Sequence, residues 1–509
     1  MSQTLDAPTT SPAPRAVRMQ QLEALRDQFT GCKTCYPRAD GTTGPRIYLD
    51  SAASNLRFEG AEAVVHEAMQ HYANTHSHLH HGARIMTEAY EQAHETVRQF
   101  VGAPPSYTAI FCGTGVTGGL NRMARVLAAQ RPERRVAITT LMEHHANDLP
   151  HRKHMDDVVH VPLEVDPDGN AGRVDMQALR SAIHEHAERL NYVAVTAASN
   201  VTGVVNPVHE IAALAHEVGA LCVVDAAQSA AHLPLTVNGP GSNDALDVIC
   251  LSGHKIYAPG SPGVIVARKE LFDGHEPEMV GGGIVEFVDA QRYEVTDRLP
   301  EREEAGTPNL PGALLLGATL HILQRVGMDV VEADEQALTQ YALSQLNQIP
   351  DLTIYGSHRL EVAERIGVIT FNLDALPHGL VTAILNDYYG IAVRNECFCA
   401  QPFVRQLLGI ADAQGVAPTS CADTCGPREQ PGMVRISFGL YNTRADVDAA
   451  VEALTDMVDR PQWYRERYRP VGDGSGDWRH TEFEVPPTEQ FDLRGNTDQW
   501  LETNTAVSP

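Results

Sequence analysis

The chain has 509 residues, of which 43% are hydrophobic and 20% are charged, as in a globular protein large enough for two or three domains. Its formal net charge of −26 argues against a nucleic-acid or anionic-membrane partner, because such a surface repels phosphate groups. No apolar run reaches the roughly 18 residues that a membrane span needs, and the N-terminus lacks the apolar core of a signal peptide, so we expect a soluble cytoplasmic protein.

Residues 1–45 are expected to form a flexible N-terminal arm with one amphipathic stretch, Val17 to Phe29. From Ile47 onward, short apolar runs alternate with helical patterns. The segment Thr87 to Val101 places its apolar side chains near one helical face, and Gly102 ends it, as glycine does at a helix C-terminus.

Six strand-like apolar runs follow, and helical patterns such as Asp175–Leu190 and Val208–Val218 separate most of them. The runs are Ala109–Phe111, Val136–Thr139, Val193–Thr196, Leu221–Val224, Val248–Leu251 and Val264–Val266. Nearly continuous apolar strands that alternate with helices indicate an α/β sheet covered on both faces. We assign residues 46–334 to this large domain, whose opening residues we allow to pack with the domain that follows.

A long helical stretch from about Gly312 to Leu346 leads into a smaller α+β domain, residues 335–462. Its strands are predicted at Val368–Phe371 and Val434–Phe438, with a helix over Leu380–Tyr388 between them. An insert at 411–432 is rich in Gly, Pro, Asp and Cys. The acidic C-terminal extension, residues 463–509, has no strong helical period, and we expect it to wrap a neighbour or stay mobile.

The nine cysteines are too few for a disulfide scaffold, and their number is odd. Cys32 and Cys35 form a Cys-x-x-Cys pair without a second pair at zinc-like spacing. Cys421 and Cys425 in the insert could complete a four-thiolate site, but nothing in the sequence brings the two pairs together. We therefore predict no metal site.

Two of the apolar runs end in residues that an enzyme using pyridoxal 5′-phosphate (PLP) requires. Asp225 follows Leu221–Val224, and Lys255 follows Val248–Leu251 in the run Leu-Ser-Gly-His-Lys. A lysine amine forms a Schiff base with the cofactor's aldehyde, and a carboxylate keeps the pyridine nitrogen protonated so that the ring accepts electrons. For most Lys/Asp pairs, a surface lysine near a solvated aspartate is the simpler interpretation. The flanking motifs therefore decide whether this pair belongs to a PLP site.

Four further motifs follow strands or open helices. The turn Gly113-Thr114-Gly115-Val116-Thr117 would let backbone N–H groups approach a phosphate at a helix N-terminus. The others are Met142-Glu143-His144-His145, Ser199-Asn200-Val201-Thr202-Gly203 and Glu304-Ala305-Gly306-Thr307-Pro308. In this order, over roughly residues 47–454, these segments resemble the class V aminotransferase family of PLP fold type I, most closely its cysteine desulfurase and selenocysteine lyase branch. The resemblance implies a mainly parallel seven-stranded sheet, a smaller second domain and PLP.

The resemblance implies a role for each residue that matches the family. Lys255 would attach the cofactor, Asp225 would pair with the pyridine nitrogen, and Gln228 would contact the phenolic oxygen. His144 would stack on the ring and help to move protons, and Asn200 would bind the 3′ oxygen or the substrate carboxylate. His145 is expected to be structural. The phosphate would be held by Gly115, Val116, Thr117, Ser252 and His254.

In the family, the segment that matches Gly306 and Thr307 reaches across a dimer interface to the partner's phosphate. The resemblance therefore implies a homodimer with a shared active site. The run Gly281-Gly282-Gly283 either shapes the entrance to this shared active site or is a mobile loop.

The segment Val393-Arg394-Asn395-Glu396-Cys397-Phe398-Cys399-Ala400-Gln401-Pro402 decides the reaction. It resembles the desulfurase segment that carries a carboxylate-binding arginine and, five residues later, the nucleophilic cysteine, here Arg394 and Cys399. Arg435 matches a second carboxylate-binding position, where a planar guanidinium holds a carboxylate bidentately. The resemblance implies removal of sulfur or selenium from L-cysteine or selenocysteine through a Cys399 persulfide, with release of alanine and passage of sulfur to an acceptor protein.

Departures from the family pattern leave alternatives open. The commonest desulfurase segment has a glycine and two histidines where this chain has Glu396-Cys397-Phe398. Cys-Phe-Cys resembles the molybdenum cofactor sulfurase variant, whereas the following Ala-Gln-Pro is desulfurase-like. Cys397 could be a second thiol, a resolving cysteine or a buried one, and Cys421 and Cys425 could relay sulfur. Another class V enzyme, such as a C–S lyase, an epimerase or an aminotransferase, would leave Cys399 unused, and a cofactor sulfurase is the remaining alternative.

Overall fold

The computed structural model describes residues 13–75, 77–241, 243–358, 360, 363–410, 431–472 and 476–505. Residues 411–430, which form nearly all of the expected insert and include Cys421 and Cys425, lie outside the described residues. The features expected of that segment therefore stay predictions.

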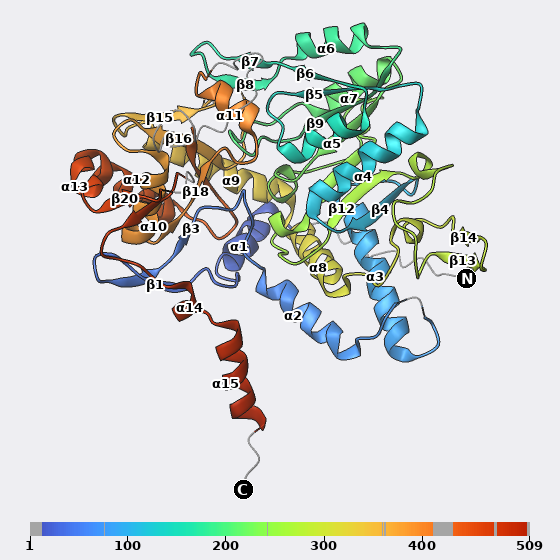
Figure 1. The fold of residues 1–509 in the computed structure, drawn as a ribbon, viewed down its shortest axis with the longest axis horizontal. Coiled ribbons are helices and arrows are strands. Elements are labelled where there is room, and N and C mark those ends of the chain that lie inside the picture. The colour runs from blue at the N-terminus through green and yellow to red at the C-terminus, as the bar shows by residue number, and fades with distance from the viewer. Residues whose placement is uncertain are drawn as a thin grey trace.

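The large domain is built on one seven-stranded sheet in the order β4–β12–β11–β10–β9–β5–β6 (Figure 1). Within this sheet, β12 alone runs antiparallel to its neighbours. The predicted α/β architecture with a mainly parallel seven-stranded sheet is confirmed. The strands are β4 (Tyr107–Cys112), β5 (Val136–Thr140), β6 (Asp157–Val161), β9 (Leu190–Thr196), β10 (Leu221–Asp225), β11 (Val248–Ser252) and β12 (Gly263–Arg268).

The edge strand β6 is missing from the six runs read off the sequence. Its residues Asp157-Val158-Val159-His160-Val161 are mostly half-exposed, so it lacks the unbroken apolar run of the six inner or better covered strands. An edge strand needs only one partner and less burial, and its apolar signal is correspondingly weak.

Helices cover both faces of this sheet because successive side chains of each strand point to opposite sides. In β9, Val193 and Val195 join the core that includes α3, α6, α7 and α8, whereas Tyr192 and Ala194 join the core beneath α4. The helices of this domain are α2 (Glu59–Ala68), α3 (His81–Phe100), α4 (Gly115–Gln130), α5 (Leu149–His154), α6 (Met176–Glu185), α7 (Val208–Glu217) and α8 (Leu310–Val326). Two hairpins complete it, β7 (Leu163–Val165) with β8 (Ala171–Val174) and β13 (Val285–Val288) with β14 (Tyr293–Val295).

The stretch expected to be helical from about Gly312 to Leu346 is helical in the structure, but it is broken at one residue. The structure has two helices, α8 and α9 (Met328–Leu346), which meet at Gly327 at an angle of 80°. Gly327 has φ +95°, a left-handed backbone that glycine adopts without steric cost and that ends an α-helix. No single helix among the described residues is long and apolar enough to cross a membrane, and this bent pair meets the criterion by length and composition alone.

The smaller sheet has the order β15–β16–β19–β18 and packs against α9, α10 and α12. Its strands are β15 (Leu352–Tyr355), β16 (Val368–Leu373), β18 (Arg394–Glu396) and β19 (Met433–Ser437), and its helices are α10 (His378–Tyr389), α11 (Gln401–Leu407) and α12 (Arg444–Asp459). The predicted boundary at residues 334/335 falls inside α9, whose Val330 packs in the large core and Leu338 in the small one. The domain limits stay a prediction. Near the start of the chain, β3 (Ile47–Tyr48) pairs with β17 (Ile391–Ala392) beside the small sheet.

Both ends of the chain carry more regular structure than the sequence indicates. In the expected flexible arm, α1 (Arg15–Leu25) buries Leu22, and the hairpin β1 (Cys35–Pro37) with β2 (Thr43–Pro45) follows. The C-terminal extension forms short elements and then α15, which projects from the body (Figure 1). These are α13 (Pro461–Arg465), β20 (Tyr468–Pro470), β21 (Trp478–His480), α14 (Pro487–Gln490) and α15 (Leu493–Thr505).

Candidate active site

The predicted site residues gather in a cavity of about 440 Å³ at the carboxyl ends of the parallel strands, between the two sheets. Ligands of open α/β sheets bind at this edge, because the loops that follow parallel strands all open there. All predicted site residues except Gly306 and Thr307 line this cavity: Gly115, Val116, Thr117, His144, Asn200, Asp225, Gln228, Ser252, His254, Lys255, Arg394, Cys399 and Arg435.

One end of the cavity has the donors that a phosphate needs. Helix α4 begins at Gly115, and the Val116 N–H donates to Ser252 Oγ at 2.9 Å. Gly115 has φ +60°, and a Cβ atom there would lie 2.9 Å from Ser252 Oγ, so a larger residue would both strain the backbone and fill the cradle. The free N–H groups of a helix N-terminus attract anions. This end of the cavity fits the cofactor's phosphate.

Burial weakens the basicity of the histidines that face the cavity. It lowers the pKa of His254 to about 4 and that of His144 to about 3, and the nearby Lys255 adds to both shifts. The Ala146 N–H donates to His144 Nδ1 at 3.0 Å, so that nitrogen is an acceptor. Both rings are therefore neutral at physiological pH, and His144 is free to pack against an aromatic ring without carrying charge.

Asp225 and Lys255 lie at the ends of adjacent strands, β10 and β11, as the sequence predicts. Asp225 is buried, and its Oδ1 accepts from the Ala227 N–H at 2.9 Å. Burial raises the pKa of Asp225, while it lowers the pKa of Lys255 to about 8 in spite of the attraction of Asp225. A buried carboxyl beside a weakly basic amine fits a cofactor that brings a pyridine nitrogen and an aldehyde.

Gln228 is buried, and its amide Nε2 donates to the Ala52 carbonyl at 2.8 Å. The amide is therefore held by the loop that follows β3, and it faces the cavity from there. This contact orients the side chain that the sequence assigns to the cofactor's phenolic oxygen.

The opposite end of the cavity holds two arginines from neighbouring strands of the small sheet. Arg394 in β18 pairs directly with Arg435 in β19. Asp50 lies between them, with Oδ2 at 2.8 Å from Arg394 Nη2 and Oδ1 at 3.4 Å from Arg435 Nη2. Burial lowers the pKa of Arg435 to about 10, so its guanidinium group stays charged at neutral pH. The pair carries one positive charge more than Asp50 balances, which suits a substrate carboxylate.

Cys399 lies on a tight turn at the rim of the cavity, and its side chain is exposed. The Ala400 N–H donates to the Cys397 carbonyl at 2.8 Å, which closes the turn. Phe398 and Cys399 have φ +51° and +55°, a left-handed conformation that costs energy in residues with a side chain. Such a conformation persists only where neighbours hold it.

Two residues hold this turn from the large domain. Asn200 donates from Nδ2 to the Phe398 carbonyl at 2.7 Å. His145 donates from its backbone N–H to the Cys399 carbonyl at 2.7 Å, and its Nε2 accepts from the Gln401 N–H at 3.3 Å. Asn200 lines the cavity as predicted. Its amide nitrogen, however, is already hydrogen-bonded to the turn. Its predicted contact with the cofactor or the substrate therefore stays a prediction.

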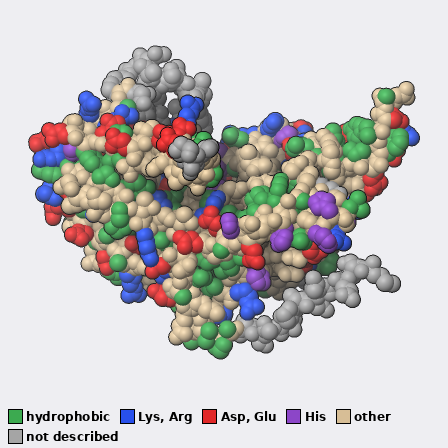
Figure 2. Space-filling model, turned by 90° about the horizontal axis from the view of Figure 1, so that it is seen from below, with side chains coloured by type: hydrophobic (Ala, Val, Ile, Leu, Met, Phe, Trp, Pro, Cys, Tyr) green, Lys and Arg blue, Asp and Glu red, His purple; other side chains and the backbone are tan. Residues whose placement is uncertain are grey.

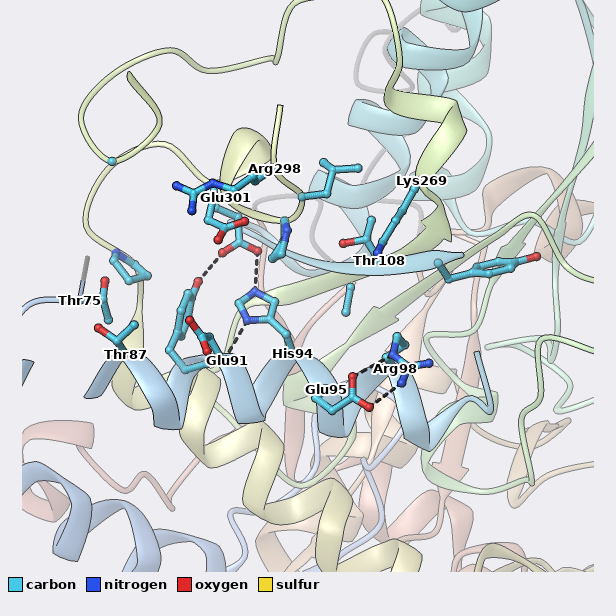
Figure 3. A pocket seen from close by; sticks show the side chains of 18 of the residues that line it. Thr75, Thr87, Glu91, His94, Glu95, Arg98, Thr108, Lys269, Arg298 and Glu301 are labelled. Carbon is cyan, nitrogen blue, oxygen red and sulfur yellow. Dashed lines mark hydrogen bonds and ion pairs between the residues drawn. The ribbon is translucent and has the colours of Figure 1, made fainter. Parts of the chain in front are cut away.

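Gly306 and Thr307 are exposed and do not line this cavity. The segment is anchored just before them: Glu304 accepts from the Tyr90 hydroxyl at 2.5 Å and pairs with His94 Nε2 at 2.9 Å. These three side chains meet in a second cavity of about 670 Å³, between α3 and the segment 298–308 (Figure 3). Positively and negatively charged side chains both line this second cavity. None of the predicted site residues lines it.

The amino-acid sequence alone indicates no role for Asp50 and only an unspecified structural one for His145. Asp50 ends the run Ile47-Tyr48-Leu49-Asp50, which the sequence marks only as a strand. A carboxylate at the end of a short apolar run is a usable signal, as it is for Asp225. Among the described residues, no group of three or more His, Cys, Asp or Glu side chains could hold a metal ion.

Comparisons with known proteins point in one direction. The sequence model of the family described as Aminotransferase class-V matches residues 47–450. A probable cysteine desulfurase of Halalkalibacterium halodurans is 34% identical over 421 residues, which cover 81% of this chain and 92% of that protein. A cysteine desulfurase of Yersinia pestis is 33% identical over 81% of this chain and 93% of its own length. The apo structure of a cysteine desulfurase from Thermococcus onnurineus superposes with a TM-score of 0.69 at 30% identity, covering 81% of this chain and 95% of that one.

Proposed function

The chain belongs to the class V aminotransferase family, and we propose that it is a PLP-dependent cysteine desulfurase that removes sulfur from L-cysteine through Cys399 and releases alanine. Membership of the family makes it a PLP-dependent enzyme of fold type I, and its relatives make it desulfurase-like. One observation carries the finer proposal: Cys399 lines the same cavity as Lys255 and the two arginines.

The cavity has a place for each part of the cofactor. The start of α4 with Ser252 and His254 would hold the phosphate, Asp225 the pyridine nitrogen, and Lys255 the aldehyde. When bound, PLP supplies an electron sink for charge released at the substrate carbon. The side chains of this protein would orient the substrate, transfer protons and remove the sulfur.

Substrate orientation would come from the arginine end of the cavity. Arg394 and Arg435 would grip the carboxylate of the amino acid, and Asp50 would keep the two guanidinium groups aligned through its contacts at 2.8 and 3.4 Å. Lys255 Nζ has the lowered pKa that lets an amine both take and return a proton near neutrality. His144, which is neutral through the physiological pH range, would stack on the cofactor ring.

The sulfur-removing step would fall to Cys399. Its thiolate attacks the substrate sulfur, the carbon–sulfur bond breaks with its electron pair retained by carbon, and a proton then replaces the sulfur there. The products are alanine and a Cys399 persulfide. The exposure of Cys399 at the rim leaves this persulfide accessible to an acceptor protein, which we also propose as a partner.

Product analysis tests this assignment. Holoenzyme given L-cysteine is expected to form alanine and sulfide in equal amounts in the presence of a reducing thiol. A C–S lyase would release sulfide together with pyruvate and ammonia in place of alanine, and an aminotransferase or an epimerase would release no sulfide. Parallel assays with cystine and selenocysteine decide the substrate, since both present the same carboxylate and amine. Absence of alanine would overturn the desulfurase proposal.

The lowered pKa of Lys255 predicts how cofactor loading depends on pH. Only the uncharged amine attacks the aldehyde, and this form becomes the major one above about pH 8. The rate of covalent attachment should rise roughly fivefold from pH 7 to pH 8 and level off by about pH 9. Stopped-flow absorbance after mixing apoenzyme with PLP measures it. A rate that still climbs severalfold from pH 9 to pH 10 would indicate an ordinary lysine.

A homodimer with a shared active site is the arrangement that we propose for Gly306 and Thr307. Glu304 before them and Asn309, which caps α8, fix the two ends of the segment and leave its middle displayed to solvent. The neighbouring β13–β14 hairpin forms an arm at the right edge of the molecule, and this arm exposes hydrophobic side chains beside charged ones (Figures 1 and 2). Val288 in this arm is 64% exposed. Exposed apolar surface of this kind is typical of a subunit interface.

Thr307→Ala should weaken PLP retention by about tenfold if its hydroxyl binds the partner's phosphate, because a hydrogen bond to a charged group contributes about 1.5 kcal/mol. Equilibrium dialysis with fluorescence detection of PLP measures the effect. Thr455→Ala, at an exposed position of α12, is the matched control and should leave retention unchanged. A holoenzyme that sedimentation shows to be monomeric would contradict the shared site.

A further inference from the structure

A second thiol lies two residues before the proposed nucleophile. Cys397 is half-buried, packs against the apolar cluster around Phe403 and Met433, and points its Sγ at the Pro431 carbonyl, 3.3 Å away. Cys399, in contrast, is exposed at the cavity.

The form of the turn allows a disulfide between its first and third residues. The hydrogen bond from the Ala400 N–H to the Cys397 carbonyl and the positive φ angles of Phe398 and Cys399 define a turn of the mirrored type I′ form. In a backbone of helical curvature, Cα atoms two residues apart are separated by roughly 5.4 Å. A disulfide needs Cα atoms between about 4.4 and 6.8 Å apart. An extended segment would hold them at roughly 7 Å, beyond that range.

We propose that Cys397 is a resolving thiol for the Cys399 persulfide, an inference that rests on the proposed function. The Cys397 thiolate attacks Cys399 Sγ, a Cys397–Cys399 disulfide forms, and the bond to the outer sulfur breaks. Hydrosulfide leaves with the electron pair of that bond and with the proton given up by Cys397. The two cysteines lose two electrons, and the outer sulfur is reduced by the same two. A small thiol in the medium, used as reductant, returns the disulfide to two free thiols.

The surroundings of Cys397 set the order of events. Burial raises the pKa of the Cys397 thiol, and Glu396 adds to the shift, so at neutral pH the thiol is mainly protonated and reacts slowly. An acceptor that docks at the exposed Cys399 then receives the persulfide sulfur first. Without an acceptor, the internal disulfide ends turnover and releases the sulfur as sulfide. The resolving step should accelerate as pH rises above neutrality, because deprotonation of Cys397 limits it.

A single-turnover experiment tests this role by mass. Holoenzyme receives one equivalent of L-cysteine without reductant, is quenched with an alkylating agent, and is analysed as intact protein and as peptides. Cys397→Ser should keep the persulfide, a gain of about 32 Da on Cys399. The unmodified chain should instead lose two alkylation sites within one peptide and release one sulfide per disulfide. Cys35→Ser, which removes an exposed cysteine of the N-terminal region, is the matched control and should behave as the unmodified chain does.

The outcomes separate the two levels of the proposal. A persulfide that persists equally in the unmodified chain and in Cys397→Ser overturns the resolving role and leaves the desulfurase proposal standing. Absence of the persulfide in Cys397→Ser overturns both. The pairing itself has an independent readout: the thiol oxidant diamide, applied to protein without cofactor, should join Cys397 to Cys399 in the peptide map. Failure of that bond to form, in protein whose Cys399 still alkylates, overturns the assignment without reference to catalysis.

Discussion

Replacing Lys255 by alanine is expected to abolish covalent attachment of PLP and to lower turnover of L-cysteine by about 10³-fold or more. Lys255 lines the cavity of the candidate active site, and burial lowers the pKa of its amine to about 8. No other lysine lines that cavity among the described residues. The amine would therefore be lost both as the point of attachment and as the group that carries protons to and from the substrate carbon.

Absorbance and activity measure the two losses separately. The purified variant should lack the visible band of lysine-bound PLP, and borohydride treatment should leave no cofactor on the protein. Lys269→Ala is the matched control, because Lys269 lines the second cavity and is exposed. It should keep both the band and the activity. A Lys255 variant that still traps PLP covalently after reduction would place the attachment elsewhere.

The parts of the site that could be predicted from sequence are those where a strand determines position. Asp225 and Lys255 follow buried apolar runs, and strands that are parallel and adjacent bring their ends together without any further information. Residues that follow such runs, among them His144 and Asn200, reach the same cavity for the same reason. The positions of these residues follow from the strands that precede them, and their expected roles follow from the resemblance to the family.

Residues that depend on long-range pairing could not be predicted in this way. Asp50 reaches Arg435 across 385 residues of sequence, because β3 pairs with β17 and places it beside the small sheet. The break at Gly327 was equally hidden, since a lone glycine in an apolar helical pattern is compatible with a continuous helix. The packing of α8 in the large core and most of α9 in the small one requires a bend there.

The turn at Cys399 shows a third limit, which is backbone conformation. Spacing from Arg394 identified the cysteine, but a left-handed Phe398 and Cys399 cannot be anticipated from residues that rarely adopt that conformation. The turn exists because Asn200 and His145 bind its carbonyl oxygens. Local sequence preference is overruled there by contacts from another domain, which is common where chemistry is performed.

Replacing Cys399 by alanine is expected to lower sulfide and alanine formation from L-cysteine by about 10³-fold or more, while PLP binding stays intact. The reason is positional: Cys399 is the exposed thiol of the cavity, whereas Cys112, Cys222 and Cys250 are buried in the large domain. Burial raises the pKa of all three of these thiols, so they remain protonated and cannot substitute for the nucleophile.

The contrast with Lys255 makes this variant informative about reaction class. Cys399→Ala should retain the visible cofactor band and should still change it when L-cysteine is added, because attachment and carboxylate binding belong to Lys255, Arg394 and Arg435. Only the transfer of sulfur should stop. Cys35→Ala, exposed and remote from the cavity, should turn over normally. Unchanged sulfide release with pyruvate as the carbon product would mean that Cys399 is a bystander and that the site performs C–S lyase chemistry, because that reaction needs the lysine and the arginines but no thiol nucleophile.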